Sequence, residues 1–263
     1  MDPWRDIPGD PGLERTALVS PRGPYVGTPP PARPLRKMAS SKRLDRLLLE
    51  LHQGFGPQMW WPAETPFEVI VGAVLTQNTA WTNVERALAN VKALIPLTPA
   101  SLLRADADAL RRALVPSGYY NAKLAKLQAI SRWYLEQGGL RALRERPLGP
   151  LRASLLGVWG IGPETADSIL CYAAGRRTAV VDAYGRRILA RHGLVPPEPS
   201  YEQTRAWLEG RLVDSQLVYE EFHALFVRAG YEGCKPDPRC AGCPATTPRA
   251  LRGRRAPSRP GAH

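Results

Sequence analysis

Gly160, Ile161 and Gly162 form a glycine–apolar–glycine triplet of a kind that can hold an anion. Pro163 follows directly and suits the first position of a helix, where its missing N–H would be unpaired anyway. Because an apolar stretch ending at Leu156 precedes the triplet, the segment predicts a helix, a tight hairpin and a second helix. The free N–H groups and the positive dipole end of that second helix can bind phosphate. Taken alone, such a triplet is more often an ordinary turn between helices.

Asp182 is the second candidate for chemistry, and it lies 18 residues after Glu164. The extended triplet Ala179–Val181 precedes it, and a helix is expected directly after it. An aspartate at such a position caps the free N–H groups of the first helical turn. A carboxylate there can also stabilise developing positive charge or orient a water molecule for attack. The capping role and the chemical role can coexist in one residue.

Aromatic side chains form a third group of candidates. Trp60 and Trp61 stand before Pro62 at an expected helix boundary, and Trp81 follows farther along the chain. A single tryptophan is most often a core residue, which is the simpler explanation here. The faces of these rings would also attract a planar cation more strongly than a neutral ring.

The cysteines are a fourth signal. Cys234, Cys240 and Cys243 lie within ten residues near the C-terminus, and four cysteines in all are too few and too clustered for a disulfide framework. Cys171 falls inside the helix expected after the hairpin, where a small buried residue is the simplest role.

Helical periodicity predicts that an all-α fold positions these residues, because alternating strand patterns are absent from the sequence. Residues 38–41 precede an amphipathic helix, and further helices are expected near 183–192, 200–213 and 216–229. The start and stop signals of the helices are the capping boxes Thr65–Glu68, Thr82–Glu85 and Ser200–Gln203, the caps Thr98, Asp106 and Asn121, and the stops Gly193 and Gly230.

The charge balance favours a polyanionic partner. The chain carries 36 basic and 24 acidic residues, a net charge of +12, and only six of the basic residues are lysine. Such an excess gives a salt-dependent attraction to nucleic acid. No signal peptide is visible and the apolar runs are too short to cross a bilayer, so a cytoplasmic protein is expected, associated with the nucleoid if it is bacterial.

Both ends of the chain look unlike its middle. Residues 1–37 contain nine prolines and no helical periodicity, and residues 247–263 are basic without an acidic residue. Both segments are expected to be disordered, since they cannot bury enough apolar surface to offset the ordering of their backbone.

Taken together, these motifs resemble the helix-hairpin-helix DNA glycosylases of the endonuclease III superfamily, and most closely the 3-methyladenine DNA glycosylase III group. The resemblance spans about residues 42–246 and rests on residues 60–62, 75–79, 116–123, 160–164, 169–173 and 181–182. It implies two all-α lobes with a cleft between them that holds the damaged base. One lobe, 66–172, would be a six-helix barrel ending in the helix-hairpin-helix, and the other would combine 38–65 with 173–246 and its cysteine loop.

The resemblance also implies roles for individual residues. Asp182 would be catalytic with Glu164 beside the hairpin, and Trp60, Trp61, Pro62 and Trp81 would form the base pocket. A glycosylase must flip its target nucleotide out of the duplex and fill the gap that this leaves. The residues expected to fill that gap or to hold the DNA are Gln77, Asn78, Tyr119, Tyr120, Asn121, Lys123, Gly160, Ile161 and Gly162. Helix capping competes as the explanation for Tyr120 and Asn121, and Lys123 could instead be a solvated surface lysine.

Two departures from the family bear on the chemistry. In endonuclease III, the position of Glu164 holds the lysine that forms a Schiff base and cuts the strand. Here no lysine occurs between Lys126 and Lys235. The family's 4Fe–4S loop has four cysteine ligands, whereas nothing after Cys243 is cysteine. Cys234, Cys240 and Cys243 are therefore expected to bind a cluster with an unidentified fourth ligand, or zinc, or no metal.

Three functions follow, in order of preference. The first is a monofunctional, monomeric DNA repair glycosylase that releases alkylated purines from double-stranded DNA. The second is an endonuclease III-like glycosylase and lyase acting on oxidised pyrimidines, against which the missing lysine argues. The third is a non-catalytic DNA-binding protein, which would need neither Asp182 nor the paired tryptophans.

Overall fold

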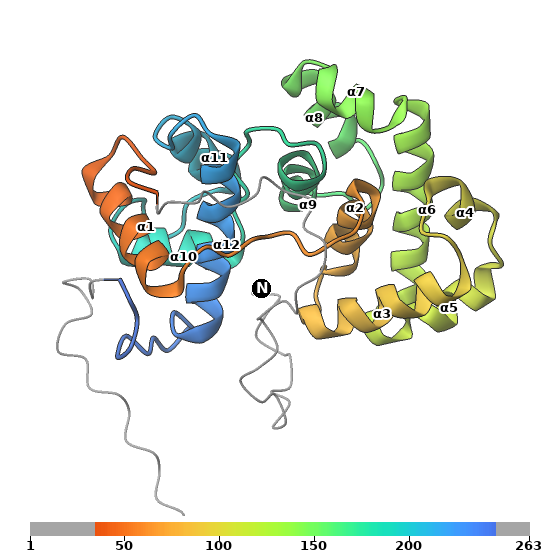
Figure 1. Cartoon of the computed structure of the whole chain (residues 1–263), viewed down its shortest axis with the longest axis horizontal. Helices are drawn as coiled ribbons and strands as arrows, with labels where there is room; N and C mark the ends of the chain where they lie inside the picture. Colours follow the sequence, from red (N-terminus) through yellow and green to blue (C-terminus); the bar gives the residue numbers. More distant parts are fainter. Residues whose placement is uncertain (1–34, 246–263) are drawn as a thin grey trace, which may run out of the picture. The chain divides into compact units, whose positions relative to one another are not determined.

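The structure, a computed structural model, describes residues 35–245, and helices joined by loops make up this part of the chain. The expectations of disorder for residues 1–37 and 247–263 lie outside this range, apart from residues 35–37. Isolated β-bridges such as Ala39–Leu212 occur between the helices, but the described residues form no β-strand. No helix in this range is both long and apolar enough to cross a membrane. Figure 1 labels most of the elements, which are α1 (Lys42–Phe55), α2 (Pro66–Leu75), α3 (Trp81–Leu94), α4 (Pro99–Arg104), α5 (Ala107–Leu114), η1 (Val115–Ser117), α6 (Tyr120–Glu136), α7 (Gly139–Glu145), α8 (Leu148–Leu156), α9 (Pro163–Ser168), η2 (Ile169–Ala173), α10 (Ala183–Arg191), α11 (Tyr201–Glu209) and α12 (Gln216–Glu232).

The described chain divides into two compact units. Unit 1 is the continuous segment Trp60–Arg177, from α2 to η2. Unit 2 combines residues 35–59, which contain α1, with residues 178–245, which contain α10, α11 and α12.

Unit 1 is built around α2. Every residue of this helix from Phe67 to Leu75 is buried, including the carboxylate of Glu68. The ammonium of Lys92 lies 2.7 Å from Glu68 and 3.1 Å from Glu64, so the buried charge is paired. A helix that is apolar on all sides needs neighbours on all sides. The neighbours of α2 are α3, α6, α9 and η2.

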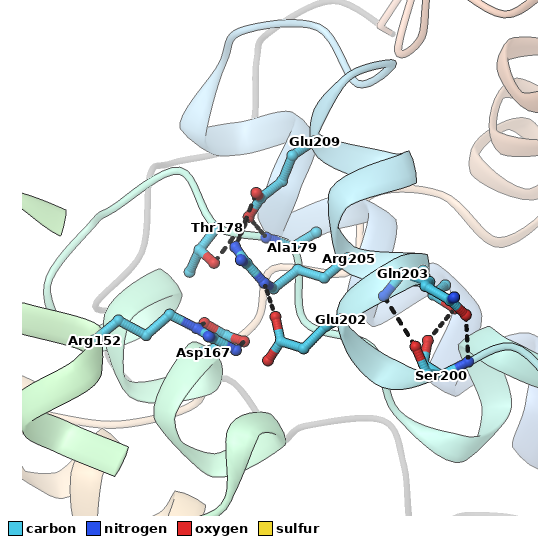
Figure 2. Close-up of polar contacts among 10 residues, drawn as sticks. Arg152, Asp167, Thr178, Ala179, Ser200, Glu202, Gln203, Arg205 and Glu209 are labelled. Carbon is cyan, nitrogen blue, oxygen red and sulfur yellow. Dashed lines mark hydrogen bonds and ion pairs between the residues drawn. The ribbon is translucent and has the colours of Figure 1, made fainter. Parts of the chain in front are cut away.

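The two helices of the hairpin are joined by a buried ion pair in unit 1. Arg152 on α8 donates two hydrogen bonds to the carboxylate of Asp167 on α9, at 2.7 and 2.8 Å (Figure 2). Asp167 is fully buried. A planar guanidinium bonded to a carboxylate through two parallel bonds fixes orientation as well as distance. The pair therefore holds α8 and α9 at a set angle across the hairpin.

Unit 2 is built around α12, which buries twelve of its residues. Helices α1 and α10 pack against it (Figure 1). Gly230 permits the close approach of α10, because a Cβ at this position would lie 2.2 Å from the ring of Tyr184. The predicted leucine face of α1 is confirmed, since Leu44, Leu47, Leu48 and Leu51 are all buried.

Most of the predicted helix starts are confirmed. Thr65, Thr98, Asp106 and Ser200 each accept a hydrogen bond from the third residue of their helix. Ser200 and Gln203 form a complete reciprocal box (Figure 2). In the box at Thr65, the carboxylate of Glu68 instead accepts from the backbone of Glu64.

Three of the predicted boundaries are wrong. Helix α3 begins at Trp81 after Ala80, so Thr82 lies inside it and caps nothing. Helix α6 begins at Tyr120 with Tyr119 as its cap residue, so Asn121 is already helical. Gly230 does not end α12, which continues to Glu232, because this glycine serves the contact with Tyr184.

The pair between Arg152 and Asp167 gives a prediction about stability. Changing Arg152→Met leaves the Asp167 carboxylate buried without its guanidinium, and we expect the free energy of unfolding to fall by about 3–5 kcal/mol. Urea denaturation measures this change. Arg141→Met is the matched control, because Arg141 also pairs with a carboxylate, that of Glu145, but is 85% exposed. Loss of this exposed pair should change the free energy of unfolding by less than about 1 kcal/mol. Equal effects of the two changes would contradict the role of the buried pair.

Candidate functional site

The predicted helix-hairpin-helix is present in unit 1. Helix α8 ends at Leu156, residues 157–162 form the hairpin, and α9 begins at Pro163. Gly160 has a φ of 79°, which is the left-handed region that glycine adopts without strain. Ile161 is buried, so its side chain anchors the hairpin and only its backbone is available to a ligand. Glu164 is exposed in the first turn of α9.

Gln77 supports this hairpin from the segment that follows α2. Its Nε2 donates to the carbonyl of Gly160 at 3.1 Å and to the hydroxyl of Thr165 at 3.0 Å. Its Oε1 accepts from the ammonium of Lys126 at 2.5 Å. The side chain of Lys126 also covers Gly160, where a Cβ would lie 2.5 Å away. The amide of Gln77, predicted to contact DNA, is thus engaged inside unit 1.

Lys123 is not the solvated surface lysine that the sequence allowed. Its side chain is 1% exposed, and its ammonium donates to the carbonyls of Leu75 and Ser117 at 2.8 and 2.5 Å. Burial lowers the pKa of Lys123 to about 8, and the positive charge of Lys126 acts in the same direction. The residue therefore joins the end of α2 to the turn before α6, and its burial argues against a contact with phosphate.

The remaining predicted DNA contacts in unit 1 are exposed. Asn78, Tyr119, Tyr120 and Asn121 all reach solvent, and Tyr119 is 72% exposed. Asn78 and Tyr119 have φ values of 56° and 44°, which non-glycine residues rarely adopt. Such strain at exposed positions is typical of functional loops.

Trp159 is a further exposed residue that the sequence analysis did not assign. It lies at the hairpin directly before Gly160 and is 61% exposed. Its position within the hairpin was the only available signal, because exposure of a tryptophan cannot be read from sequence.

The predicted base-pocket tryptophans cluster in unit 1. The rings of Trp60, Trp61 and Trp81 lie with centroids 5.4 to 6.4 Å apart. Tyr172, from η2, joins them at 5.3 Å from Trp61 and 6.4 Å from Trp60. Tyr172 was not among the predicted pocket residues, although the sequence placed it one residue after the buried Cys171.

The cluster has a buried side and a more accessible side. Trp61 and Tyr172 are buried, and Trp61 packs on Gly72, where a Cβ would lie 3.1 Å from its indole nitrogen. Trp60, Trp81 and Pro62 are half-buried. The indole N–H of Trp81 is held by Glu85 at 2.9 Å, which fixes the orientation of the ring. Trp61 is therefore a core residue, and Trp60 and Trp81 keep ring surface for a ligand.

Asp182 caps α10 in unit 2, as predicted. Its carboxylate accepts a 2.6 Å hydrogen bond from the N–H of Gly185, and the residue is 7% exposed. A glycine suits the third position because a Cβ there would lie 3.1 Å from the same carboxylate oxygen. Burial raises the pKa of Asp182 to about 6, against the opposing effects of the Gly185 bond and of Arg187 and Arg186.

The segment that leads to Asp182 is held by α11. The carboxylate of Glu209 accepts from the hydroxyl of Thr178 at 3.0 Å and from the N–H of Ala179 at 3.1 Å (Figure 2). Arg205 bonds both oxygens of Glu209 and also Glu202, so the glutamate is itself oriented. These contacts set the start of the extended residues 178–181 and thereby the position of the Asp182 backbone.

A family comparison identifies this arrangement. A sequence profile described as HhH-GPD superfamily base excision DNA repair protein matches residues 71–212, which include the hairpin and Asp182. A candidate DNA repair glycosylase of Methanocaldococcus jannaschii is 40% identical over 193 residues, covering 72% of this chain and 88% of that protein. The chain belongs to the HhH-GPD superfamily of base excision DNA repair proteins. It is a DNA repair glycosylase.

Other relatives of this glycosylase cover most of its length. Endonuclease III of Escherichia coli is 26% identical and covers 78% of this chain and 93% of that protein. The H. pylori 3-methyladenine DNA glycosylase bound to 1,N6-ethenoadenine has a TM-score of 0.61 at 27% identity, covering 71% and 96% of the two chains. A trapped endonuclease III–DNA covalent intermediate has a TM-score of 0.64 at 20% identity, covering 76% and 90%, and it shows the shared fold.

The cysteine loop of this glycosylase brings its three cysteines to one small cavity. Cys234, Cys240 and Cys243 all line this cavity, together with residues of α1 and α10. Between residues 35 and 245, no three His, Cys, Asp or Glu side chains are arranged to hold a metal ion. Burial raises the pKa of the Cys243 thiol, and its two neighbouring cysteines act in the same direction.

Two arginines of α10 hold this loop. Arg187 donates to the carbonyl of Cys234 at 2.7 Å, and Arg191 donates to the sulfur of Cys234 at 3.2 Å and to the carbonyls of Lys235 and Pro236. These contacts fix the backbone of the loop at residues 234–236.

The burial of Asp182 gives a prediction about stability and pH. Because the folded-state pKa is raised from 3.8 to about 6, ionisation of Asp182 lowers stability as pH rises through that interval. Asp182→Asn keeps the cap and removes the buried charge, so at pH 7.5 the variant should be more stable by about 1–3 kcal/mol.

Urea denaturation at several pH values measures this gain, which should shrink as the pH is lowered from 7 toward 4. Asp106→Asn, at another helix cap that is exposed, is the control and should leave stability nearly unchanged at every pH. A destabilised Asp182→Asn variant at pH 7.5 would show that the charge is favourable where it lies.

Proposed function

We propose that this glycosylase is monofunctional and releases alkylated purine bases from double-stranded DNA by hydrolysis of the N-glycosidic bond. The observation that carries the proposal is the combination of a buried, helix-capping carboxylate, Asp182, with a hairpin that offers no reactive lysine. In this proposal Asp182 acts on the sugar, and Trp60 and Trp81 bind the base. The hairpin and the exposed residues near it contact the DNA backbone and fill the gap that the flipped nucleotide leaves.

Asp182 acts on the sugar. Departure of the base leaves positive charge on the deoxyribose, as in other glycoside hydrolyses. A fixed carboxylate stabilises that charge, and in a site with little solvent its effect is larger than in water. With a pKa of about 6, Asp182 is ionised at neutral pH and can orient water for attack.

The lysines of unit 1 that the structure describes are all engaged in contacts, which argues against an amine as the nucleophile. Glu164, at the position where a lyase would carry its lysine, cannot form an imine. Lys123 has a pKa near 8 that would suit a nucleophile, but its nitrogen is buried and bonded to two carbonyls. Lys126 is bonded to Gln77, and Lys92 pairs with Glu64 and Glu68. These contacts argue against the second function, an endonuclease III-like lyase.

The tryptophans favour a cationic base. N-alkylated purines such as 3-methyladenine carry positive charge, so the faces of Trp60 and Trp81 attract them beyond ordinary stacking. A cationic base is also a good leaving group, which removes the need for a general acid. The likeness to the H. pylori 3-methyladenine DNA glycosylase supports the same substrate class.

Exposed residues of unit 1 are proposed to fill the gap in the duplex. Tyr119 and Asn78 occupy strained loop positions and are exposed, and Tyr120 and Asn121 lie beside Tyr119. Gln77 is assigned a different task, because its amide braces the hairpin through Gly160 and Thr165.

Changing Trp60→Leu tests the base pocket. The change keeps apolar bulk but removes a ring face worth about 0.5–2 kcal/mol toward a cation, so excision of a cationic alkylated base should fall about 2- to 30-fold. Single-turnover release of the base measures it, with a neutral lesion for comparison. Trp207→Leu, in α11 of unit 2, is the control and should change neither rate. Equal losses on cationic and neutral lesions would return Trp60 to a purely structural role.

Changing Asp182→Asn tests the chemical role of the carboxylate. Base release should fall by about 10²–10⁴-fold, the range for loss of a charge-stabilising or acid–base group. Binding to damaged duplex should stay within a few-fold, because the hairpin offers backbone N–H groups that this change does not touch.

Borohydride reduction during turnover tests for an imine. The natural chain should give no covalent protein–DNA adduct, and Glu164→Lys is the matched variant that supplies an amine at the hairpin. A strong adduct with the natural chain would show that an amine reaches the sugar, and the monofunctional assignment would then be wrong.

A further inference from the structure

A groove of about 790 Å³ lies in unit 2, beside α10 and outside the residues assigned above. It is formed by α10 and by residues 197–203, which lead into α11. Asp182 does not line it, although the next residue, Ala183, does. The charged and polar side chains of its lining are Arg186, Arg187, Arg191, Glu198, Ser200 and Gln203.

Two of the arginines, Arg187 and Arg191, are held in place by contacts with other residues of unit 2. Arg187 uses its Nε for the carbonyl of Cys234, and its guanidinium lies 5.2 Å from the centroid of the Tyr184 ring. Arg191 uses both terminal nitrogens for the loop at residues 234–236. The terminal nitrogens of Arg187 make no hydrogen bond to any residue between 35 and 245. A guanidinium fixed in this way loses little further freedom when it binds an anion.

Arg186 is the uncommitted cation of the groove. It is exposed, and within residues 35–245 no carboxylate pairs with it. Glu198 is the single acidic residue of the lining, and Ser200 and Gln203 are engaged with each other at the start of α11. The lining therefore carries three arginines and one glutamate, which leaves a net positive groove.

The chemistry of the lining selects the kind of anion. Guanidinium groups bind phosphate oxygens through paired hydrogen bonds. None of the lining residues is aromatic, so a nucleobase would have no ring on which to stack. A phosphodiester backbone meets these conditions better than a free nucleotide does, and successive arginines along one helix suit an anion that repeats.

We propose that this groove binds the sugar–phosphate backbone of duplex DNA through Arg186 and the terminal nitrogens of Arg187. The proposal rests on the proposed function in one respect, since it takes duplex DNA as the substrate. The contact is independent of sequence and of damage, because phosphates carry neither kind of information. Its role is to hold duplex next to the element that begins with Asp182.

The test is the salt dependence of binding to an undamaged duplex at pH 8, where Asp182 is ionised in every variant. Arg186→Ala should weaken binding about 3- to 10-fold and reduce the slope of log Kobs against log salt by about 0.9, the value for one lost phosphate contact. Arg186→Lys keeps the charge and should recover most of both quantities.

Arg46→Ala is the matched control. Arg46 belongs to α1 of the same unit, its side chain is 68% exposed, and its nearest carboxylate oxygen is 4.0 Å away, so the change removes one positive charge outside the groove. It should leave affinity and slope close to those of the natural chain. Equal losses for Arg46→Ala and Arg186→Ala would reduce the effect to net charge and overturn the proposal, as would an unchanged slope for Arg186→Ala.

Single-turnover base release separates this proposal from the proposed function. At saturating protein and at pH 8, Asp182 stays ionised even without the effect of Arg186 on its pKa. Under these conditions Arg186→Ala should release an alkylated base within about 2-fold of the natural rate, because it weakens binding and not the reaction. A large fall in that rate would place Arg186 in the reaction and overturn its role as a backbone contact. If the natural chain released no alkylated base while the slope still changed, the proposed function would fail and the groove would stand.

Discussion

The carboxylate of Asp182 and the N–H of Gly185 form the contact on which the account of this glycosylase depends. The bond fixes the carboxylate at the start of α10 while burial keeps it from water. The hydrogen bond lowers the pKa of Asp182 and burial raises it, and the effect of burial is the larger. The protein therefore holds a carboxylate whose ionisation costs stability, and perturbed carboxylates of this kind cluster at functional sites. The buried cap is thus both a weak point in stability and the centre of the proposed reaction.

Around the hairpin and in the segment before Asp182, charged side chains are held by partners within their own unit. Glu209 is oriented by Arg205 and in turn holds the segment before Asp182. Asp167 is paired with Arg152 across the hairpin. Lysines are used in the same way, since Lys123 and Lys126 hold backbone and amide oxygens in unit 1. A chain with so few lysines therefore has none left at the hairpin for imine chemistry, and this agrees with a water nucleophile.

Sequence reasoning succeeded where the local signal and the structural requirement coincide. The glycine–apolar–glycine hairpin, the cap at Asp182 and the leucine face of α1 depend on short-range patterns, and all three are present. The family is likewise shown, whereas the individual DNA contacts and the substrate stay predictions.

Asn121 and Thr82 were wrong as caps because a polar residue near a helix start can stand one or two positions inside it. Burial of Lys123, engagement of Gln77 and exposure of Trp159 depend on residues far apart in the chain, which no local pattern encodes. The metal content of the cysteine loop stays a prediction, since spacing alone does not fix the arrangement of three sulfurs.

The most direct test of the central claim is the pH dependence of base release under single-turnover conditions, on a duplex with one permanently cationic alkylated purine. Such a base needs no proton to leave, so the rate reports the ionisation of the protein and not of the substrate. If the Asp182 carboxylate stabilises the sugar, the rate should be constant above about pH 7 and fall toward tenfold per pH unit below about pH 6. Asp182→Asn should be slow and show no such fall. A rate that stays constant from pH 5 to pH 8 in the natural chain, or an unchanged acid limb in Asp182→Asn, would contradict the role of this carboxylate.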